Sequence, residues 1–397
     1  MIAIYVTSPM MLGALRGIPA RRGSEKTALR AEARGRLSPP ISIKENIMRK
    51  LASVQTIWDV QPIEGADRIE VVSVLGWKCV AKKGEFKKYD LCVYFEVDAF
   101  LPVKPEFEFL RDGCYRSNDL NGEGFLMKTR NFRGQVSQGL VLPLSILDGI
   151  EPLDGVAWKT GDIVSEQLGV KKWEVAEIAT GSGRVIGDFP HGIPKTDEIR
   201  VQAEPGLIDE FKGVPYYIST KMDGTSVTMY LIDGDFGVCS RNYEIANDET
   251  SPAWKFVHKH NVIEKIKKGS EAVGLKNLAV QGEFCGEGIQ KNPLKLVTAE
   301  WYVFTLRDMD QGKRLGLKKM QAFCEAASLN MVPVEETGDE LPYKTVEEFI
   351  ERAKGKYASG NHKEGIVIRP IEPVYSKILE GPLSMKVINN DYLLKQK

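Results

Sequence analysis

The octapeptide Ser219-Thr220-Lys221-Met222-Asp223-Gly224-Thr225-Ser226 is the most informative segment of this chain. It lies between two β-rich runs at 216–220 and 227–232, so a lysine ends one predicted strand and an Asp-Gly turn leads into the next. Alone, a Lys-x-Asp-Gly pattern predicts only a hairpin, because about one chain in ten of this length would contain it by chance. Its meaning depends on the segments that follow it.

Five further segments follow in order, and each contains or borders a β-rich run with a charged or aromatic side chain. They are Ser240-Arg241-Asn242, Val280-Gln281-Gly282-Glu283-Phe284, Trp301-Tyr302-Val303-Phe304-Thr305, Lys363-Glu364-Gly365-Ile366-Val367-Ile368-Arg369 and Ser384-Met385-Lys386-Val387-Ile388-Asn389. Helical spacing between these runs at 253–268, 318–327 and 345–356 predicts an α+β domain.

These ordered segments resemble the motifs of the covalent nucleotidyltransferases, and the resemblance implies a chemistry that explains their residue types. A lysine amine can attack the α-phosphorus of ATP and hold AMP as a phosphoramidate. At an ordinary lysine pKa, only roughly one amine in a few thousand is neutral at pH 7, so the site must lower that pKa by desolvation or nearby cations. Lysines and a metal ion would stabilise the phosphoryl charge, carboxylates would bind the metal, and an aromatic ring would stack on adenine.

The six ordered motifs resemble those of the covalent nucleotidyltransferases, the superfamily of ATP-dependent ligases and capping enzymes, over roughly 216–392. The resemblance implies ATP and Mg²⁺ or Mn²⁺ as cofactors, Lys221 as the adenylated nucleophile, and Asp223 as the acid that orients the ribose or the metal. It implies Glu364 as the metal ligand. It also implies nucleotide contacts from Thr220, Gly224, Arg241, Glu283 (to the ribose), Phe304 (to adenine) and Lys386 (to phosphate).

The last motif departs from the superfamily pattern. That pattern has two lysines two residues apart, whereas here Lys386 is accompanied only by Ser384 on one side and Ile388 on the other.

Residues 48–148 predict a different, all-β domain. Runs at 51–63, 69–80, 91–97 and 139–142 alternate with turn residues, which indicates a small OB-like barrel of a kind that binds oligonucleotides. Basic residues near Phe132 suit a surface that follows phosphates and stacks on bases, although solvated surface lysines would give the same pattern. Residues 149–200, rich in Gly, Asp and Pro, predict a linker, and 201–397 predict the nucleotidyltransferase domain.

Composition excludes several classes of protein. Lysine plus arginine balances aspartate plus glutamate at 54 each, so the chain is not uniformly basic, although a local basic groove remains compatible with this balance. Six scattered cysteines without a Cys-x-x-Cys pair argue against a zinc site or a secreted disulfide scaffold. The chain has no apolar run that approaches the roughly 18 residues of a membrane span.

Residues 1–47 have three interpretations. They hold eight Lys and Arg against three Glu, which fits a disordered or spurious extension before Met48, an organelle transit peptide, or a basic arm that contacts nucleic acid. We expect a cytoplasmic protein, with organelle targeting as the alternative.

The order of the domains narrows the resemblance. Capping enzymes and most DNA ligases carry an OB domain after the last lysine motif, but only 387–397 follow Lys386 here. A barrel placed first, with the segments 48–52, 62–70 and 221–226, is similar to the Deinococcus-type nick-sealing RNA ligases. That family implies a monomeric ATP-dependent RNA ligase that seals 3′-OH/5′-phosphate nicks in duplexes with an RNA 3′-OH strand. A GTP-using capping-type enzyme and a non-catalytic nucleic-acid-binding protein are the alternatives.

Overall fold

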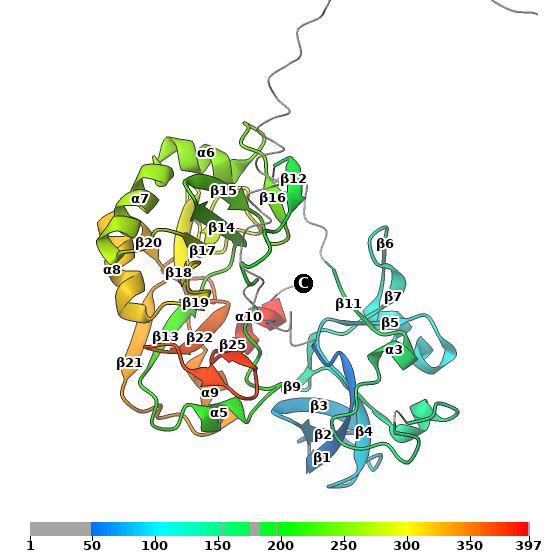
Figure 1. Ribbon diagram of the computed structural model, residues 1–397. Helices are drawn as coiled ribbons and strands as arrows, with labels where there is room; N and C mark the ends of the chain where they lie inside the picture. The colour runs from blue at the N-terminus through cyan, green and yellow to red at the C-terminus, as the bar shows by residue number, and fades with distance from the viewer. Residues whose placement is uncertain (1–48, 153, 175–182, 196, 396–397) are drawn as a thin grey trace, which may run out of the picture. The chain divides into compact units, whose positions relative to one another are not determined.

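The computed structural model describes residues 49–152, 154–174, 183–195 and 197–395, and Figure 1 shows their strands and helices along the chain. The predicted extension at 1–47 lies outside the described residues. The described chain forms an N-terminal domain of antiparallel sheets and a C-terminal α+β domain, so the predicted fold class is confirmed.

The N-terminal domain contains a five-stranded antiparallel sheet in the order β10-β4-β1-β2-β3. These strands are β1 (Ala52–Pro62), β2 (Ile69–Val74), β3 (Trp77–Lys82), β4 (Leu91–Phe95) and β10 (Leu140–Pro143). The β-rich run at 69–80 is a hairpin, because Leu75 adopts a left-handed backbone with φ 52° and reverses the chain before β3. Strand alternation then buries Trp77 and Cys79 on one face of β3.

A second sheet of this domain has the order β11-β5-β7-β6, and a separate hairpin joins β8 to β9. The bounds are β5 (Ala99–Pro102), β6 (Tyr115–Asn118), β7 (Gly122–Leu126), β8 (Thr129–Phe132), β9 (Gln135–Gln138) and β11 (Lys171–Lys172). The short helices are η1 (Pro105–Leu110), α2 (Arg111–Cys114), η2 (Leu144–Leu147) and α3 (Ser165–Leu168). Phe107 and Phe125 pack with Val93 and Leu101 in the core that these elements enclose.

The stretch 149–200, expected as a linker, contributes one strand to the N-terminal domain and one to the C-terminal domain. Val164, Leu168 and Val170 are buried in the N-terminal core, and β11 pairs with β5. Further along, β12 (Val185–Asp188) pairs with β16 (Tyr243–Ile245) of the C-terminal domain.

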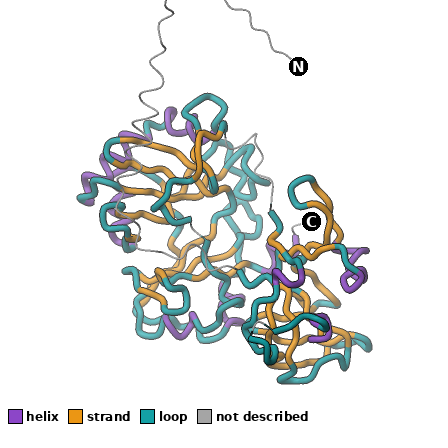
Figure 2. Tube along the Cα trace, turned by 45° about the vertical axis from the view of Figure 1, so that its right-hand side comes forward, coloured by secondary structure: helices purple, strands orange, loops and turns teal. Residues whose placement is uncertain are grey.

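The C-terminal domain has two main sheets, visible as two sets of orange strands in Figure 2, and their strands are antiparallel except for the parallel pairing of β20 with β18. The larger sheet has the order β12-β16-β15-β14-β17-β18-β19, and β20 pairs with β18. Its further strands are β14 (Thr225–Ile232), β15 (Asp235–Cys239), β17 (Leu278–Cys285), β18 (Glu300–Asp308), β19 (Lys313–Arg314) and β20 (Asn330–Met331). The smaller sheet, β21-β13-β22-β25, consists of β13 (Tyr216–Lys221), β21 (Val334–Gly338), β22 (Gly365–Pro370) and β25 (Met385–Ile388).

Three helices cover one face of the larger sheet: α6 (Pro252–Lys259), α7 (Val262–Val273) and α8 (Leu317–Ala327) (Figure 1). Their apolar sides, with Trp254 and Phe323, pack on Val280 of the sheet. The helix expected at 253–268 is two helices, because Asn261 takes a left-handed backbone with φ 51° and redirects the chain. The helix expected at 318–327 is present as α8.

The smaller sheet is covered by α9 and by shorter elements. The helix α9 (Val346–Arg352) starts with a capping box between Thr345 and Glu348, and Phe349 packs in the core beneath it. It ends earlier than the predicted 345–356. The remaining elements are α5 (Leu207–Glu210), the hairpin β23 (Tyr375–Ser376) to β24 (Gly381–Pro382), and α10 (Asn390–Lys395).

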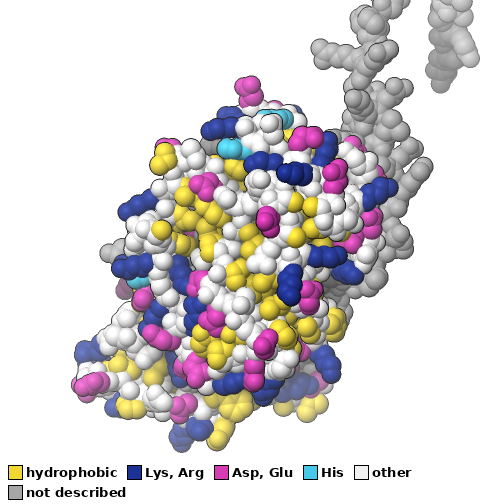
Figure 3. Space-filling model, turned by 90° about the vertical axis from the view of Figure 1, so that its left-hand side faces the viewer, with side chains coloured by type: hydrophobic (Ala, Val, Ile, Leu, Met, Phe, Trp, Pro, Cys, Tyr) yellow, Lys and Arg dark blue, Asp and Glu magenta, His cyan; other side chains and the backbone are white. Residues whose placement is uncertain are grey.

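The surface carries charges of both signs. On the face shown in Figure 3, the Lys and Arg side chains of the described residues alternate with Asp and Glu, as the balanced composition leads one to expect. Within the part of the chain that the structure describes, no helix is both long enough and apolar enough to cross a membrane.

Candidate active site

Lys221 and Glu364 meet where two neighbouring strands end. Lys221 is the last residue of β13 and lies opposite Gly365, the first residue of β22, so the strand pairing places Glu364 beside the lysine. The ammonium Nζ donates to Glu364 Oε2 at 2.7 Å, and the two side chains are 24% and 19% exposed. Burial alone would lower the pKa of Lys221, but the carboxylates of Glu364 and Glu283 outweigh it and hold the pKa above its ordinary value. The structure therefore does not show the lowered pKa that the sequence analysis expected for this lysine.

Two more carboxylates complete this acidic surrounding. Glu283 lies on β17 opposite Ser226 of β14, and Asp223 lies in the turn that joins β13 to β14. Burial raises the pKa of Glu283 to about 7, and the negative charges of Glu364 and Asp223 add to the rise. Burial also raises the pKa of Asp223, although the Tyr392 hydroxyl donates to Asp223 Oδ2 at 2.6 Å.

Gly224 lets the Asp-Gly turn approach β17 closely. A Cβ on this residue would lie 2.3 Å from the carbonyl oxygen of Phe284 and 2.7 Å from Cys285 Sγ. The Gly224 backbone also forms a hydrogen bond with the carboxylate of Glu283. Glycine is therefore required here for close packing, and the predicted nucleotide contact of Gly224 stays a prediction.

Lys386 and Arg241 share one carboxylate partner. Lys386 Nζ donates to Asp197 Oδ1 at 2.6 Å, and Arg241 Nη2 lies 3.6 Å from the other oxygen, Oδ2. Burial lowers the pKa of Lys386, Asp197 opposes this, and the nearby charge of Lys221 lowers it further. Lys386 is only 17% exposed, while more than half of the Arg241 side chain is exposed.

Phe304 is fixed by an arginine that connects the two sheets. It lies on β18 of the larger sheet and packs against Met222, the residue after Lys221. Arg369 of β22, in the smaller sheet, donates to the Phe304 carbonyl and lies 5.9 Å above the centre of its ring. The buried Arg369 is in turn paired with Glu198.

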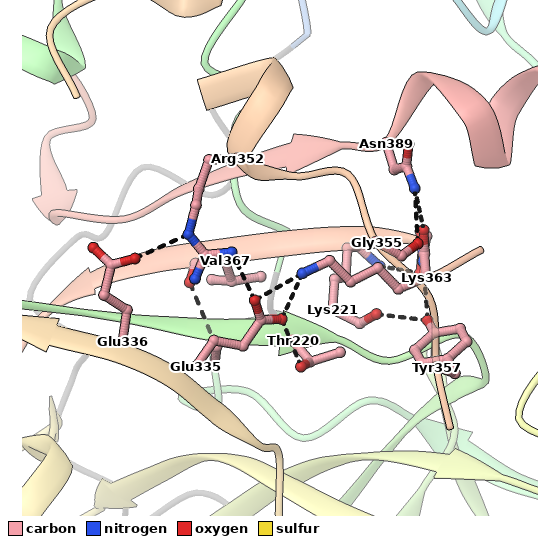
Figure 4. Close-up of polar contacts among 12 residues, drawn as sticks. Thr220, Lys221, Glu335, Glu336, Arg352, Gly355, Tyr357, Lys363, Val367 and Asn389 are labelled. Carbon is pink, nitrogen blue, oxygen red and sulfur yellow. Dashed lines mark hydrogen bonds and ion pairs between the residues drawn. The ribbon is translucent and has the colours of Figure 1, made fainter. Parts of the chain in front are cut away.

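The side chain of Thr220 does not face the same way as that of Lys221, and its predicted nucleotide contact stays a prediction. Neighbouring side chains alternate across a strand, and Thr220 Oγ1 donates to Glu335 Oε1 at 2.8 Å on the other face. Figure 4 shows Glu335 also accepting from Lys363 Nζ at 2.7 Å and from Arg352 Nη1 at 2.8 Å. This ion-pair cluster supports the strand end of β13 on the face opposite the Lys221 side chain.

Sequence reasoning missed several residues of the site. Asp197 and Glu198 lie in the expected linker, while Glu335, Tyr357 and Tyr392 lie outside the six motifs. A signal was available only for Tyr392, which follows the last motif closely.

The donor set fits one divalent cation held together with a nucleotide. Glu364, Asp223 and Glu283 are close enough to act on one another electrostatically, and a cation would relieve that repulsion. Over the described parts of the chain, no three His, Cys, Asp or Glu side chains form a preformed metal cage. Mg²⁺ commonly takes one or two carboxylates and completes its shell with phosphate oxygens and water.

Comparison with known proteins identifies the family. An OB-fold domain model matches residues 51–144, and an RNA ligase model matches 214–388. The RNA ligase of Naegleria gruberi, solved with PPi, is 34% identical, has a TM-score of 0.76, and the match covers 87% of this chain and 98% of that one. The chain belongs to the RNA ligase family.

Further structures of the Naegleria gruberi RNA ligase show similar agreement. A lysine-to-methionine mutant with AMP and Mn is 34% identical over 87% of this chain and 98% of that chain, with a TM-score of 0.76. A lysine-to-alanine mutant with ATP and Mn is 33% identical over 86% and 98%, again with a TM-score of 0.76. A search of curated proteins gives no match. The prediction that this chain is an enzyme, an RNA ligase, is confirmed.

Proposed function

We propose that this RNA ligase uses ATP to seal 3′-OH/5′-phosphate nicks through a covalent Lys221–AMP intermediate, in the manner of the Deinococcus-type family. The observation that carries the proposal is the ammonium of Lys221, a quarter exposed, among three carboxylates with Lys386 nearby. The solved structures of the Naegleria enzyme with ATP, AMP and Mn support ATP and a divalent metal as cofactors of this RNA ligase.

The first step transfers AMP to the protein. The ammonium of Lys221 must lose a proton, and Glu364 Oε2 is an acceptor already at hydrogen-bond distance. The neutral amine then forms a nitrogen–phosphorus bond with the α-phosphorus of ATP. The bond from that phosphorus to the bridging oxygen breaks, and its electron pair leaves with pyrophosphate.

The next two steps move AMP onto the RNA and then release it. An oxygen of the 5′-phosphate at the nick attacks the same phosphorus. The nitrogen–phosphorus bond breaks, its electron pair returns to the Lys221 nitrogen, which takes up a proton, and an AMP-capped 5′ end remains. The 3′-OH oxygen next attacks the 5′-phosphorus, loses its proton, and forms the phosphodiester as AMP departs.

The protein's side chains have distinct parts in this sequence. Lys386, close to Lys221, supplies positive charge to the phosphoryl oxygens, and the Phe304 ring stacks on adenine. Glu283 accepts a hydrogen bond from the ribose, and Arg241, the most exposed of the set, contacts the nucleotide or the 5′-phosphate strand. Glu364 and Asp223 would hold the divalent ion, which supplies further positive charge to the phosphates.

We further propose that the partner is a nicked duplex whose 3′-OH strand ends in RNA, bound in part by the OB-fold domain. The support is the OB-fold match and the basic residues of that domain, namely Lys82, Lys83, Lys87, Lys88, Lys128, Arg130 and Arg133.

The test compares two nicked duplexes that differ only in the sugar of the 3′-OH terminal nucleotide. With ATP and Mg²⁺ or Mn²⁺, the ribose-ended nick should be sealed and the deoxyribose-ended nick should accumulate the AMP-capped strand. Equal sealing of both nicks would contradict the proposed specificity. Covalent labelling of the protein by GTP instead of ATP would favour a capping-type enzyme, and tight RNA binding without any labelling would favour a non-catalytic role.

A further inference from the structure

Tyr357 lies next to the ion pair of Lys221 and Glu364 but belongs to none of the six sequence motifs. It is in the loop between α9 and β22, and its ring packs in the apolar cluster with Met222, Cys285 and Phe304. Its own backbone is fixed, because its N–H donates to the Asn361 carbonyl at 2.9 Å. The ring and the backbone therefore hold the hydroxyl in one place.

That hydroxyl connects the two backbone segments that carry the reactive side chains. Tyr357 Oη donates to the carbonyl oxygen of Lys221 at 2.8 Å and accepts from the backbone N–H of Glu364 at 3.0 Å (Figure 4 shows the first contact).

The bridge lies just past the end of the β13–β22 pairing. The last pair of residues in register is Lys221 with Gly365, so Glu364 is one residue beyond the ladder. The Glu364 carbonyl accepts from the Asn389 N–H at 2.9 Å, while its N–H is bound by Tyr357. Both backbone polar groups of Glu364 are thus hydrogen-bonded. Tyr357 Oη links the Glu364 N–H to the carbonyl oxygen of Lys221.

This arrangement separates backbone position from side-chain motion. Nζ of Lys221 must leave Glu364 Oε2 to attack a phosphorus, so the 2.7 Å ion pair has to open during the first step. The Tyr357 bridge involves only backbone atoms of the two residues and therefore persists when their side chains part. The end of β13 and the start of β22 therefore keep their spacing when the Lys221–Glu364 ion pair opens and Lys221 reacts with the nucleotide.

We propose that Tyr357 is a positioning residue for adenylylation, and that its hydroxyl fixes the spacing between Lys221 and Glu364. The inference rests on the proposed Lys221–AMP chemistry. It assigns no contact with ATP to Tyr357, so loss of the hydroxyl should reduce the rate at saturating ATP and leave ATP binding almost unchanged.

The test is Tyr357→Phe, which keeps the ring, with Tyr343→Phe as the matched control. The Tyr343 hydroxyl donates to Glu336 Oε2 at 2.9 Å in the same domain but touches neither strand end. We expect Tyr357→Phe to lower the single-turnover rate constant of protein adenylylation at saturating ATP by about ten- to a hundred-fold. The ATP concentration that gives half of this rate should change by no more than about two-fold. Tyr343→Phe should change neither constant.

A second readout separates positioning from general damage. A nick whose 5′ end already carries AMP does not need the attack of Lys221, so Tyr357→Phe should seal it with a much smaller loss than it shows in adenylylation. Equal losses in the two assays, or an adenylylation rate constant within about two-fold of wild type, would overturn the inference. Failure of the wild-type protein to take up AMP would instead contradict the proposed function itself.

If Tyr357→Phe does not yield folded protein, hydrogen exchange in the wild type carries the test. The Glu364 amide, which lies outside the ladder, should exchange as slowly as the paired amides of β22, because its N–H donates a hydrogen bond to Tyr357 Oη. Rapid exchange at Glu364 beside slow exchange in β22 would overturn the bridge.

Discussion

Replacing Glu198 by Gln tests the ion pair that holds the two sheets of the ligase domain around the site. Glu198 and Arg369 are paired with side chains 14% and 5% exposed, and Arg369 also donates to the Phe304 carbonyl and to Thr305 Oγ1. Glutamine keeps the shape and an acceptor oxygen but removes the charge, which leaves Arg369 as a buried cation without a counter-charge. We expect a large loss of stability from a nearly isosteric change.

The size of that loss follows from the pKa of the carboxyl. Burial would raise the pKa of Glu198, but the Arg369 guanidinium outweighs burial and lowers it from 4.5 to about 2. Each pKa unit corresponds to about 1.36 kcal/mol, so the folded state favours the charged carboxylate by roughly 3 kcal/mol. Because the folded-state pKa is depressed, this stability is fully present above pH 4.5 and is lost as the pH falls toward 2.

The assay is urea unfolding followed by tryptophan fluorescence, since Trp254 and Trp301 are buried in the core of this domain. At neutral pH, Glu198→Gln should unfold with roughly 3 kcal/mol less free energy than wild type, and the difference should shrink below pH 4.5. Glu264→Gln is the control, because Glu264 is exposed and paired only across one helical turn with Lys267, and it should change little. A difference below about 1 kcal/mol at neutral pH, or one that does not depend on pH, would refute the reasoning.

Three further predictions concern the site directly. Glu364→Ala should abolish metal-dependent adenylylation while circular dichroism shows an intact fold, because it removes the carboxylate beside Lys221; near-normal labelling would exclude the metal role. Gly224→Ala should lower the free energy of unfolding by about 1–3 kcal/mol and slow adenylylation, since its Cβ would meet the Phe284 carbonyl; an unchanged urea midpoint would contradict the close packing. The adenylylation rate at low ATP should rise from neutral to alkaline pH, because the pKa of Lys221 is held above its ordinary value and only the neutral amine attacks; a rate that falls with pH would argue against this.

The parts of the site that could be predicted from the sequence share a local signal. Lys221, Glu283 and Glu364 each lie at or near the end of a β-rich run, and strand ends are recognisable from apolar alternation. The sequence of a single run does not show that these three residues lie close together in the fold. It follows from the pairing of β13 with β22 and of β14 with β17.

The parts that could not be predicted depend on contacts between distant residues. Glu198 pairs with a residue 171 positions away, and Asp197 with one 189 positions away, so neither leaves a periodic pattern. The partner of the Thr220 side chain, Glu335, could not be predicted, because a motif names residues without saying which face of the strand each one occupies. The helix expected at 253–268 was interrupted for a similar reason: Asn261 permits a left-handed backbone, but its presence does not require one.

The most direct measurement of the central claim is the site of covalent AMP on the protein. Wild-type protein, Lys221→Ala and Lys268→Ala, an exposed lysine on α7, are incubated with ATP and Mg²⁺, denatured, and analysed by intact mass and peptide mapping. Wild type and Lys268→Ala should each carry one AMP on the peptide that contains Lys221, and Lys221→Ala should carry none. Retention of AMP by Lys221→Ala, or its attachment at another residue of the wild type, would contradict the account.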